Sequence, residues 1–326
     1  IRLSLVGSEM CIRDRFRAFS EEYLGEDQTV WQELSALMQP EQSRWLDPMD
    51  RLHLVDALLW NRFVRGYAGT VLEQSAALFE QPGGEAPTST LQRTLIALLH
   101  HRAAAASATL GRPSDTAHHL ERGVALRTPD TEPTHTRIAF LSYQLYIHLE
   151  LGDLTAAMAL LEGYRALGLH PMAVPFHQRK IYIFQAYLCL ARLQEASEIE
   201  RPARRLELQR ALRELRVASA APLFRCHGKV IASALQVLEG RIDPAIRTLA
   251  EAEALASRAD CPWAHFEIAR WRARQMARQG NRIEAQRFAR GAQTLAQEQD
   301  WNGRLRRLRQ EFQLEPAEWS TADTPQ

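Results

Sequence analysis

The chain has very little lysine, little cysteine and no long hydrophobic run. Lysine occurs only at Lys180 and Lys229, so nearly all of the 40 basic residues are arginines, a bias that we attribute to GC-rich codons. The four cysteines stand far apart without a C-x-x-C pair, which fits neither a zinc site nor a disulfide framework and favours a reducing environment. No segment approaches the roughly 18 apolar residues of a membrane span, and no secretory leader is recognisable. We therefore expect a cytoplasmic protein.

Net charge and catalytic motifs are missing as well. The 40 basic and 39 acidic residues leave a formal charge of +1, so no overall field favours nucleic acid or an anionic membrane as a partner. The sequence contains no phosphate-binding loop, no dinucleotide-binding fingerprint, no zinc-protease motif and no kinase catalytic loop. We predict no catalytic residue, no cofactor and no metal site in this chain.

Two local clusters need an interpretation. The pairs His100-His101 and His118-His119 are adjacent residues, whereas metal-binding pairs on a helix usually stand four apart, so packing or solvent exposure is favoured. The one local excess of positive charge contains Arg304, Arg306, Arg307 and Arg309. We interpret it as the solvated face of a terminal capping helix, with nucleic-acid binding as the alternative.

The two ends of the chain differ from the rest. Residues 1–15, IRLSLVGSEMCIRDR, show no helical or strand period, and from Ser4 to Arg15 they resemble the translation of a sequencing adapter. We expect the true protein to begin at or before Phe16 and this chain to be the C-terminal fragment of something longer. Residues 315–326 are predicted to be a polar tail.

Apolar residues recur at helical spacing from Phe16 to about Leu314, and no run alternates with the period of a strand. The pattern predicts an all-α fold of about 12 to 14 helices, cut by glycine and proline. The segment 16–84 is predicted to be helical, either a divergent repeat or the end of an upstream module. Residues 85–314 are predicted to be a continuous helical array.

An internal repeat appears within this array. Each of three glycines is followed at offset 5 by an alanine and at offsets 9 and 12 by further apolar or small residues. Glycine permits a sharp turn between antiparallel helices, and the small residue at offset 5 lets them approach closely. A fourth turn, without its glycine, is expected between Leu193 and Arg201. The repeat positions are Gly152 with Ala157, Gly240 with Ala245, and Gly280 with Ala285.

This spacing resembles the second helix of the tetratricopeptide repeat, although the period is near 40 residues and the first-helix signature is degenerate. The resemblance implies an α-solenoid of antiparallel helix pairs, typical of the C-terminal regions of large bacterial signalling proteins. In that family a Ser/Thr kinase or a regulatory ATPase module lies upstream. In such an array each repeat buries its apolar face only against its neighbours.

The resemblance also implies that the first helix of each pair lines a concave surface. We expect that surface to bind a protein or peptide, or another part of the same protein, through aromatic anchors and a basic groove that suits an acidic segment. The expected anchors are Tyr143, Tyr146, Tyr182 and Tyr187, and the expected basic residues are Arg225, Lys229, Arg270 and Arg274.

Three functions remain open from the sequence. The first is a non-catalytic scaffold for signalling that works through protein binding or intramolecular regulation. The second is the regulatory part of a kinase or ATPase whose catalytic module lies upstream. The third is the inducer-binding repeat region of a transcription activator.

Overall fold

The computed structural model describes residues 48–80, 87, 89–128, 132–175 and 178–314. These residues form thirteen α-helices and one 3-10 turn, and no strand occurs among them. The predicted all-α class is therefore confirmed over the described residues. The predictions for residues 1–15, 16–47 and 315–326 lie outside the described residues.

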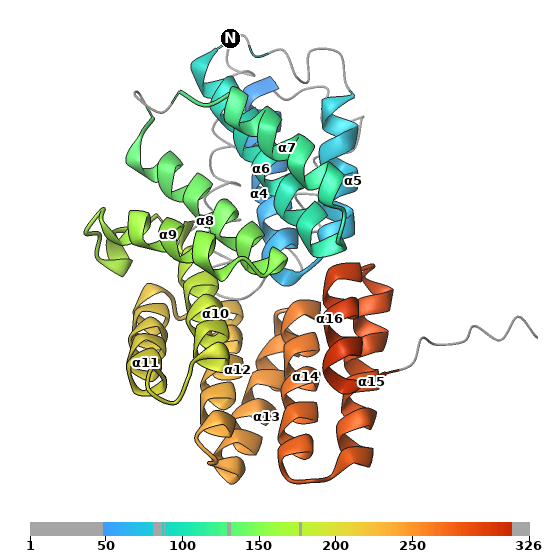
Figure 1. The fold of residues 1–326 in the computed structure, drawn as a ribbon. Helices are drawn as coiled ribbons and strands as arrows, with labels where there is room; N and C mark the ends of the chain where they lie inside the picture. Colours follow the sequence, from blue (N-terminus) through green and yellow to red (C-terminus); the bar gives the residue numbers. More distant parts are fainter. Residues whose placement is uncertain (1–47, 81–86, 88, 129–131, 176–177, 315–326) are drawn as a thin grey trace, which may run out of the picture.

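The helices follow one another as hairpins in which each helix packs against the next (Figure 1). A 3-10 turn, η2 (Pro171–Ala173), precedes α10, and a single helix, α16 (Asn302–Phe312), follows the last hairpin. The hairpins are α4 (Pro48–Arg65) with α5 (Ala68–Phe79), α6 (Thr90–Leu110) with α7 (Pro113–Ala125), α8 (Thr134–Leu151) with α9 (Leu154–Arg165), α10 (Lys180–Glu195) with α11 (Arg201–Ala218), α12 (Pro222–Leu238) with α13 (Ile242–Arg258), and α14 (Pro262–Arg278) with α15 (Arg282–Glu298).

The predicted repeat glycines stand between the two helices of a hairpin. Gly152, Gly240 and Gly280 have φ angles of 80°, 74° and 77°, in the left-handed region where a side chain would be strained. The alanines five residues later, Ala157, Ala245 and Ala285, are buried. The turn expected without a glycine lies between α10 and α11. The local pattern in the sequence therefore located the turns correctly.

The first helices of successive hairpins form one layer, since α6 contacts α8, α8 contacts α10, α10 contacts α12, and α12 contacts α14. We call these the inner helices and their partners α7, α9, α11, α13 and α15 the outer helices. The array then curls back on itself: α14 contacts α4, and α16 packs against α6 and α8 (Figure 1). The expectation that each repeat packs only on its neighbours is wrong, because the two ends of the array bury apolar surface against each other.

Candidate interaction surface

Packed rings occupy the centre of the inner helices. Phe63, in the last turn of α4, lies edge-on to Tyr146 with ring centroids 4.9 Å apart. Trp263, in the first turn of α14, stacks on Tyr187 at 5.2 Å. Such ring pairs contribute about 0.5–1.5 kcal/mol each beyond the burial of their area. We call this group the aromatic core, and its members are Phe63, Tyr143, Tyr146, Phe184, Tyr187, His227 and Trp263.

Two residues between α4 and α5, Gly66 and Tyr67, form hydrogen bonds with residues near the C-terminal end of the array. The indole N–H of Trp301 donates to the carbonyl of Gly66 at 3.0 Å, and the hydroxyl of Tyr67 donates to Asp260 at 2.8 Å. Gly66 has a φ of 111°, and a Cβ there would lie 2.8 Å from the Trp301 ring. Burial, together with the bond to Asp260, raises the pKa of Tyr67 to about 12. The link therefore fits only where glycine stands at position 66.

The four tyrosines predicted as exposed anchors are all in the interior. Tyr143 and Tyr146 are 0% and 3% exposed, and Tyr182 and Tyr187 are 2% and 8% exposed. The prediction of an open aromatic groove is therefore wrong, because Phe63 lies against Tyr143 and Tyr146, Trp263 lies against Tyr187, and Tyr164 lies against Tyr182. Each hydroxyl also has an internal partner: Lys180 for Tyr143, Arg304 for Tyr146, Tyr164 for Tyr182, and His227 for Tyr187.

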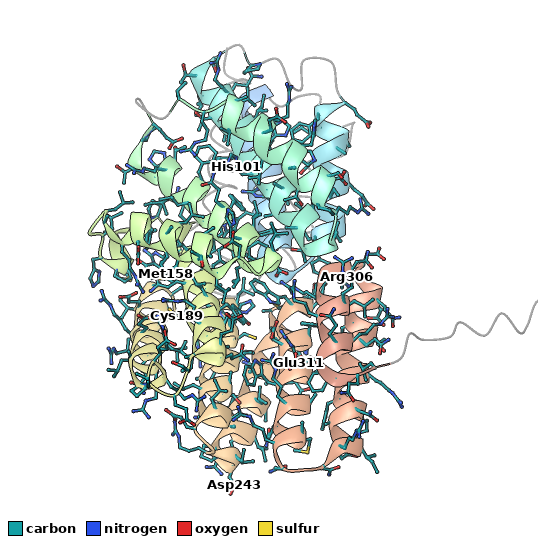
Figure 2. All side chains as sticks on the ribbon, in the orientation of Figure 1. His101, Met158, Cys189, Asp243, Arg306 and Glu311 are labelled. Atoms are coloured by element: carbon teal, nitrogen blue, oxygen red, sulfur yellow. The ribbon has the colours of Figure 1, made fainter. Side chains whose placement is uncertain are left out.

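Arg270 and Arg274 do lie together, on α14, but their site is filled from within. Both guanidinium groups bind the carboxylate of Glu311 on α16, with Arg270 donating at 2.8 and 2.9 Å (Figure 2). Burial would raise the pKa of Glu311, but the two arginines outweigh burial and hold that pKa below its usual value. The two arginines bind an acidic group, which is the kind of ligand predicted for the basic groove. That group is Glu311 of the same chain, and it is not part of a partner.

The other two predicted basic residues form a separate pair of positions on α12. Arg225 is exposed, and one turn later Lys229 makes an ion pair with Glu251 of α13. Side chains this accessible are solvated, so the pair adds little to stability. The four basic residues predicted as one groove therefore divide into an exposed pair and an internally neutralised pair.

Arg304 was predicted to be solvated and is instead buried, with 4% of its side chain exposed. Its guanidinium binds Glu150 of α8 and donates to the Tyr146 hydroxyl at 3.0 Å, and Arg307 adds a 2.9 Å ion pair to the same carboxylate. Burial alone would raise the pKa of Glu150, but the two arginines outweigh it and lower that pKa to about 2. Glu150 is the only carboxylate in α8, and this isolation within an apolar helix was the signal that could have identified it.

The thiol of Cys261 lies beside two members of the aromatic core, His227 and Tyr187. The sulfur of Cys261 is 3.8 Å from Nε2 of His227, and Nδ1 of that ring is 3.0 Å from the hydroxyl of Tyr187. Burial raises the pKa of Cys261 to about 12 and lowers the pKa of His227 to about 3. Both groups are thus neutral near pH 7, and since a nucleophile must be a thiolate, the arrangement favours packing over catalysis.

The paired histidines lie between α6 and α7. His100 and His101 are fully buried, with Nδ1 of His100 3.1 Å from Nδ1 of His119 and the Nδ1–H of His101 donating to Ala97 at 2.8 Å. Burial lowers their pKa values to about 3 and 4. Across the described ranges, no three metal-binding side chains gather in one place. The geometry supports the interpretation that these histidines pack.

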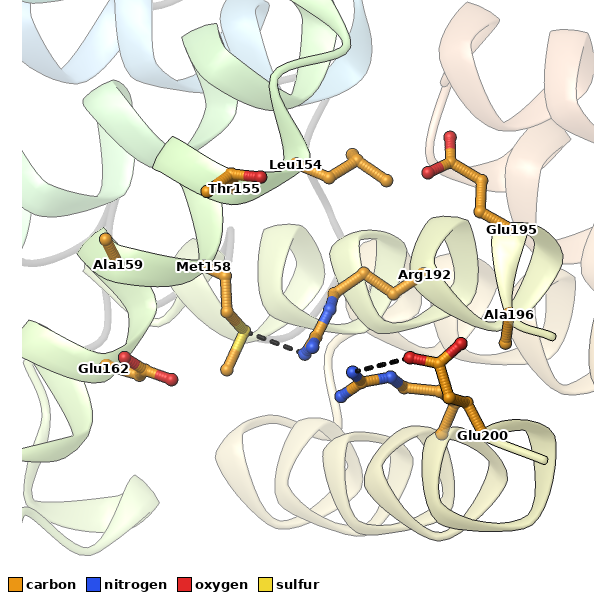
Figure 3. A pocket seen from close by; sticks show the side chains of 10 residues that line it. Leu154, Thr155, Met158, Ala159, Glu162, Arg192, Glu195, Ala196 and Glu200 are labelled. Carbon is orange, nitrogen blue, oxygen red and sulfur yellow. Dashed lines mark hydrogen bonds and ion pairs between the residues drawn. The ribbon is translucent and has the colours of Figure 1, made fainter.

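A pocket of about 500 Å³ opens on the outer side of the array, between α9 and the junction of α10 with α11 (Figure 3). Arg192 reaches into it and contacts the sulfur of Met158 at 3.0 Å, while Arg204 pairs with Glu200 at 3.8 Å. Glu207 of α11 pairs with both arginines, with Arg192 at 3.0 Å and with Arg204 at 2.9 Å. Both guanidinium groups of the pocket are therefore already paired with carboxylates.

Two further observations bear on function: the search for membrane-spanning helices and the comparison with known proteins. Over the part of the chain that the structure describes, no helix has the length and apolar character to cross a membrane. The chain matches no protein-family model, no curated protein sequence and no solved structure. The interpretation of function therefore depends on the geometry of the inner helices.

Proposed function

We propose that this chain is a tetratricopeptide-like helical scaffold whose inner helices bind a helix that presents an aromatic side chain. Its activity is recognition, and α4 is the helix that occupies the site in the closed form. The observation that carries this proposal is Phe63 of α4 seated among rings from α8 and α10.

Two features support the repeat assignment. Successive first helices start at residues 134, 180, 222 and 262, a spacing near the 40 residues of the sequence repeat. Within three of the hairpins, a left-handed glycine precedes a buried alanine by five residues, at Gly152, Gly240 and Gly280. Stacked hairpins with this turn form the α-solenoid that the sequence pattern favours.

The chemistry of the site indicates what kind of helix it suits. The rings that surround Phe63 offer edge and face contacts, and Val64 in the same turn is 1% exposed. Such a face suits the i, i+3, i+4 apolar pattern of an amphipathic helix. Because α4 already supplies one, the intramolecular form of the proposal is favoured: an upstream segment is held through α4 and released when α4 leaves.

The test uses a fluorescent peptide of residues 48–67 added to the full chain. In the wild type, α4 is tethered at a millimolar effective concentration and excludes the peptide. In the Phe63→Ala variant the tethered helix loses its anchor. We therefore expect the wild-type peptide to bind the variant chain at least about tenfold more tightly than it binds the wild-type chain. Fluorescence anisotropy measures both affinities.

A peptide that itself carries Phe63→Ala is the matched control and should not bind. Circular dichroism checks that the variant chain keeps its helices, and Phe63→Leu provides a milder variant if the alanine form unfolds. Failure of the wild-type peptide to bind either folded variant would show that α4 is an ordinary core helix, and the proposal would then be wrong.

A further inference from the structure

The outer helix α11 carries a charge pattern that the inner helices do not explain. Its two carboxylates both face α10, where Glu207 pairs with Arg192 and Glu214 accepts from Gln185 at 2.6 Å. The rest of α11 is largely exposed and carries further arginines, of which Arg210 pairs with Glu214 one turn later. Arg205, Arg213 and Arg216 make no ion pair with any residue that the structure describes.

Exposed apolar side chains lie in line with these arginines. Leu206 and Val217 are 62% and 46% exposed, and eleven residues of helix, about 16 Å, place them on the same side. Met172 of η2, 51% exposed, lies near the C-terminal end of α11, because η2 packs against that helix. Its sulfur is 3.9 Å from the guanidinium of Arg179, which donates to the carbonyl of Ala218 at 2.7 Å. We call these six residues the α11 face: Met172, Arg205, Leu206, Arg213, Arg216 and Val217.

We propose that the α11 face binds an acidic amphipathic helix of a protein partner. Three unpaired guanidinium groups supply the positive charge, and Leu206 and Val217 supply apolar surface on the same side of the helix for the partner's apolar side. A nucleic acid fits less well, because single-stranded chains are bound through exposed aromatic rings and α11 has none. The helix lies on the outer flank of the array, away from α4 and the aromatic core (Figure 1).

The probe is a fluorescent acidic peptide of about 18 residues, the length of α11, with leucines on one helical face and glutamates on the others. The test variant is R205E/R213E/R216E in the full chain. The control is R247E/R258E/R290E, which reverses three exposed arginines on the outer helices α13 and α15. We expect the test variant to lose at least about tenfold in affinity and the control less than about twofold.

Two further measurements separate charge from the apolar stripe. Leu206→Ala with Val217→Ala should weaken binding about threefold or more, and a peptide of the same composition with its leucines scattered should bind less tightly than the amphipathic one. Equal losses in the two triple variants would overturn the proposal. Tighter binding of an oligothymidine of equal length than of the peptide would overturn it in favour of a nucleic acid.

Discussion

The inner and outer helices of the fourth hairpin differ strongly in how much of their surface is buried. The inner helix α10 buries 12 of its 16 residues, whereas the outer helix α11 buries four of 18. A helix apolar on every side must be covered on every side, and one with a single apolar stripe needs one neighbour. Packing therefore constrains most positions of α10. The outer helices leave most of theirs available for contacts with other molecules.

The largest expected effect comes from breaking an ion pair on the inner side. Glu150→Ala removes the carboxylate that neutralises Arg304, whose side chain is 4% exposed. An unpaired buried charge costs about 3–5 kcal/mol, so we expect the free energy of unfolding in urea to fall by about that amount. On the outer side, Arg210→Ala removes a partner of Glu214 that is 65% exposed and should change stability by less than about 1 kcal/mol.

The double variant Glu150→Ala with Arg304→Met sharpens this comparison. Glu150→Ala alone leaves the buried guanidinium of Arg304 without its carboxylate, and Arg304→Met removes that charge. The double variant should therefore be more stable than Glu150→Ala alone. If Glu150→Ala and Arg210→Ala prove equally mild, the inner ion pair is solvated and the contrast between the two sides fails.

The second prediction concerns acid. Burial first, and the nearby Arg304 second, lower the pKa of His227 to about 3 from an ordinary value of 6.5. On acidification the unfolded chain therefore takes up a proton near pH 6.5, while the folded chain does not until far lower pH, so stability falls as the pH drops below about 6.5. The urea midpoint measured between about pH 7 and 5 tests this, above the range in which Glu150 titrates.

The His227→Asn variant is the control for this pH dependence. Its amide keeps an oxygen near the Tyr187 hydroxyl but cannot be protonated, so its stability should depend less steeply on pH than that of the wild type. Some slope should remain, since burial also lowers the pKa values of His100 and His101. If the variant and the wild type show the same dependence of stability on pH, His227 takes up its proton as readily in the folded chain as in the unfolded chain, and its pKa is not lowered.

The sequence was informative wherever the cause of a structure is local. Glycines at Gly152, Gly240 and Gly280 mark turns because a left-handed residue must end each helix there. Pro262 begins α14, where its fixed φ suits the first turn and its missing N–H is not needed. Helical period and turn residues therefore predicted the hairpins, and with them most of the fold.

Contacts between the ends of the array had no such local cause. Arg304 looks solvated among its sequence neighbours, and only the closure of the array brings it to Glu150, 154 residues earlier. The tyrosines of α8 would line an open groove in a straight array, and Phe63 covers them only because α4 reaches the centre. The candidate site was misjudged because apolar periodicity shows that a face is buried without showing what buries it.

The smallest expected effects come from adding one methyl group to a helical glycine on each side. A Cβ at Gly123 of α7, which faces the inner helix α6, would lie 2.5 Å from Nδ1 of His101, a ring fixed by its bond to Ala97. Gly123→Ala should therefore lower the free energy of unfolding by about 1–3 kcal/mol. A Cβ at Gly163 of α9 meets nothing within 4 Å, and Gly163→Ala should raise stability by about 0.5–1 kcal/mol, because alanine loses less backbone entropy on folding. Urea unfolding of both variants gives the two signs directly, and equal signs would mean that α7 can shift away from α6 to admit the methyl group.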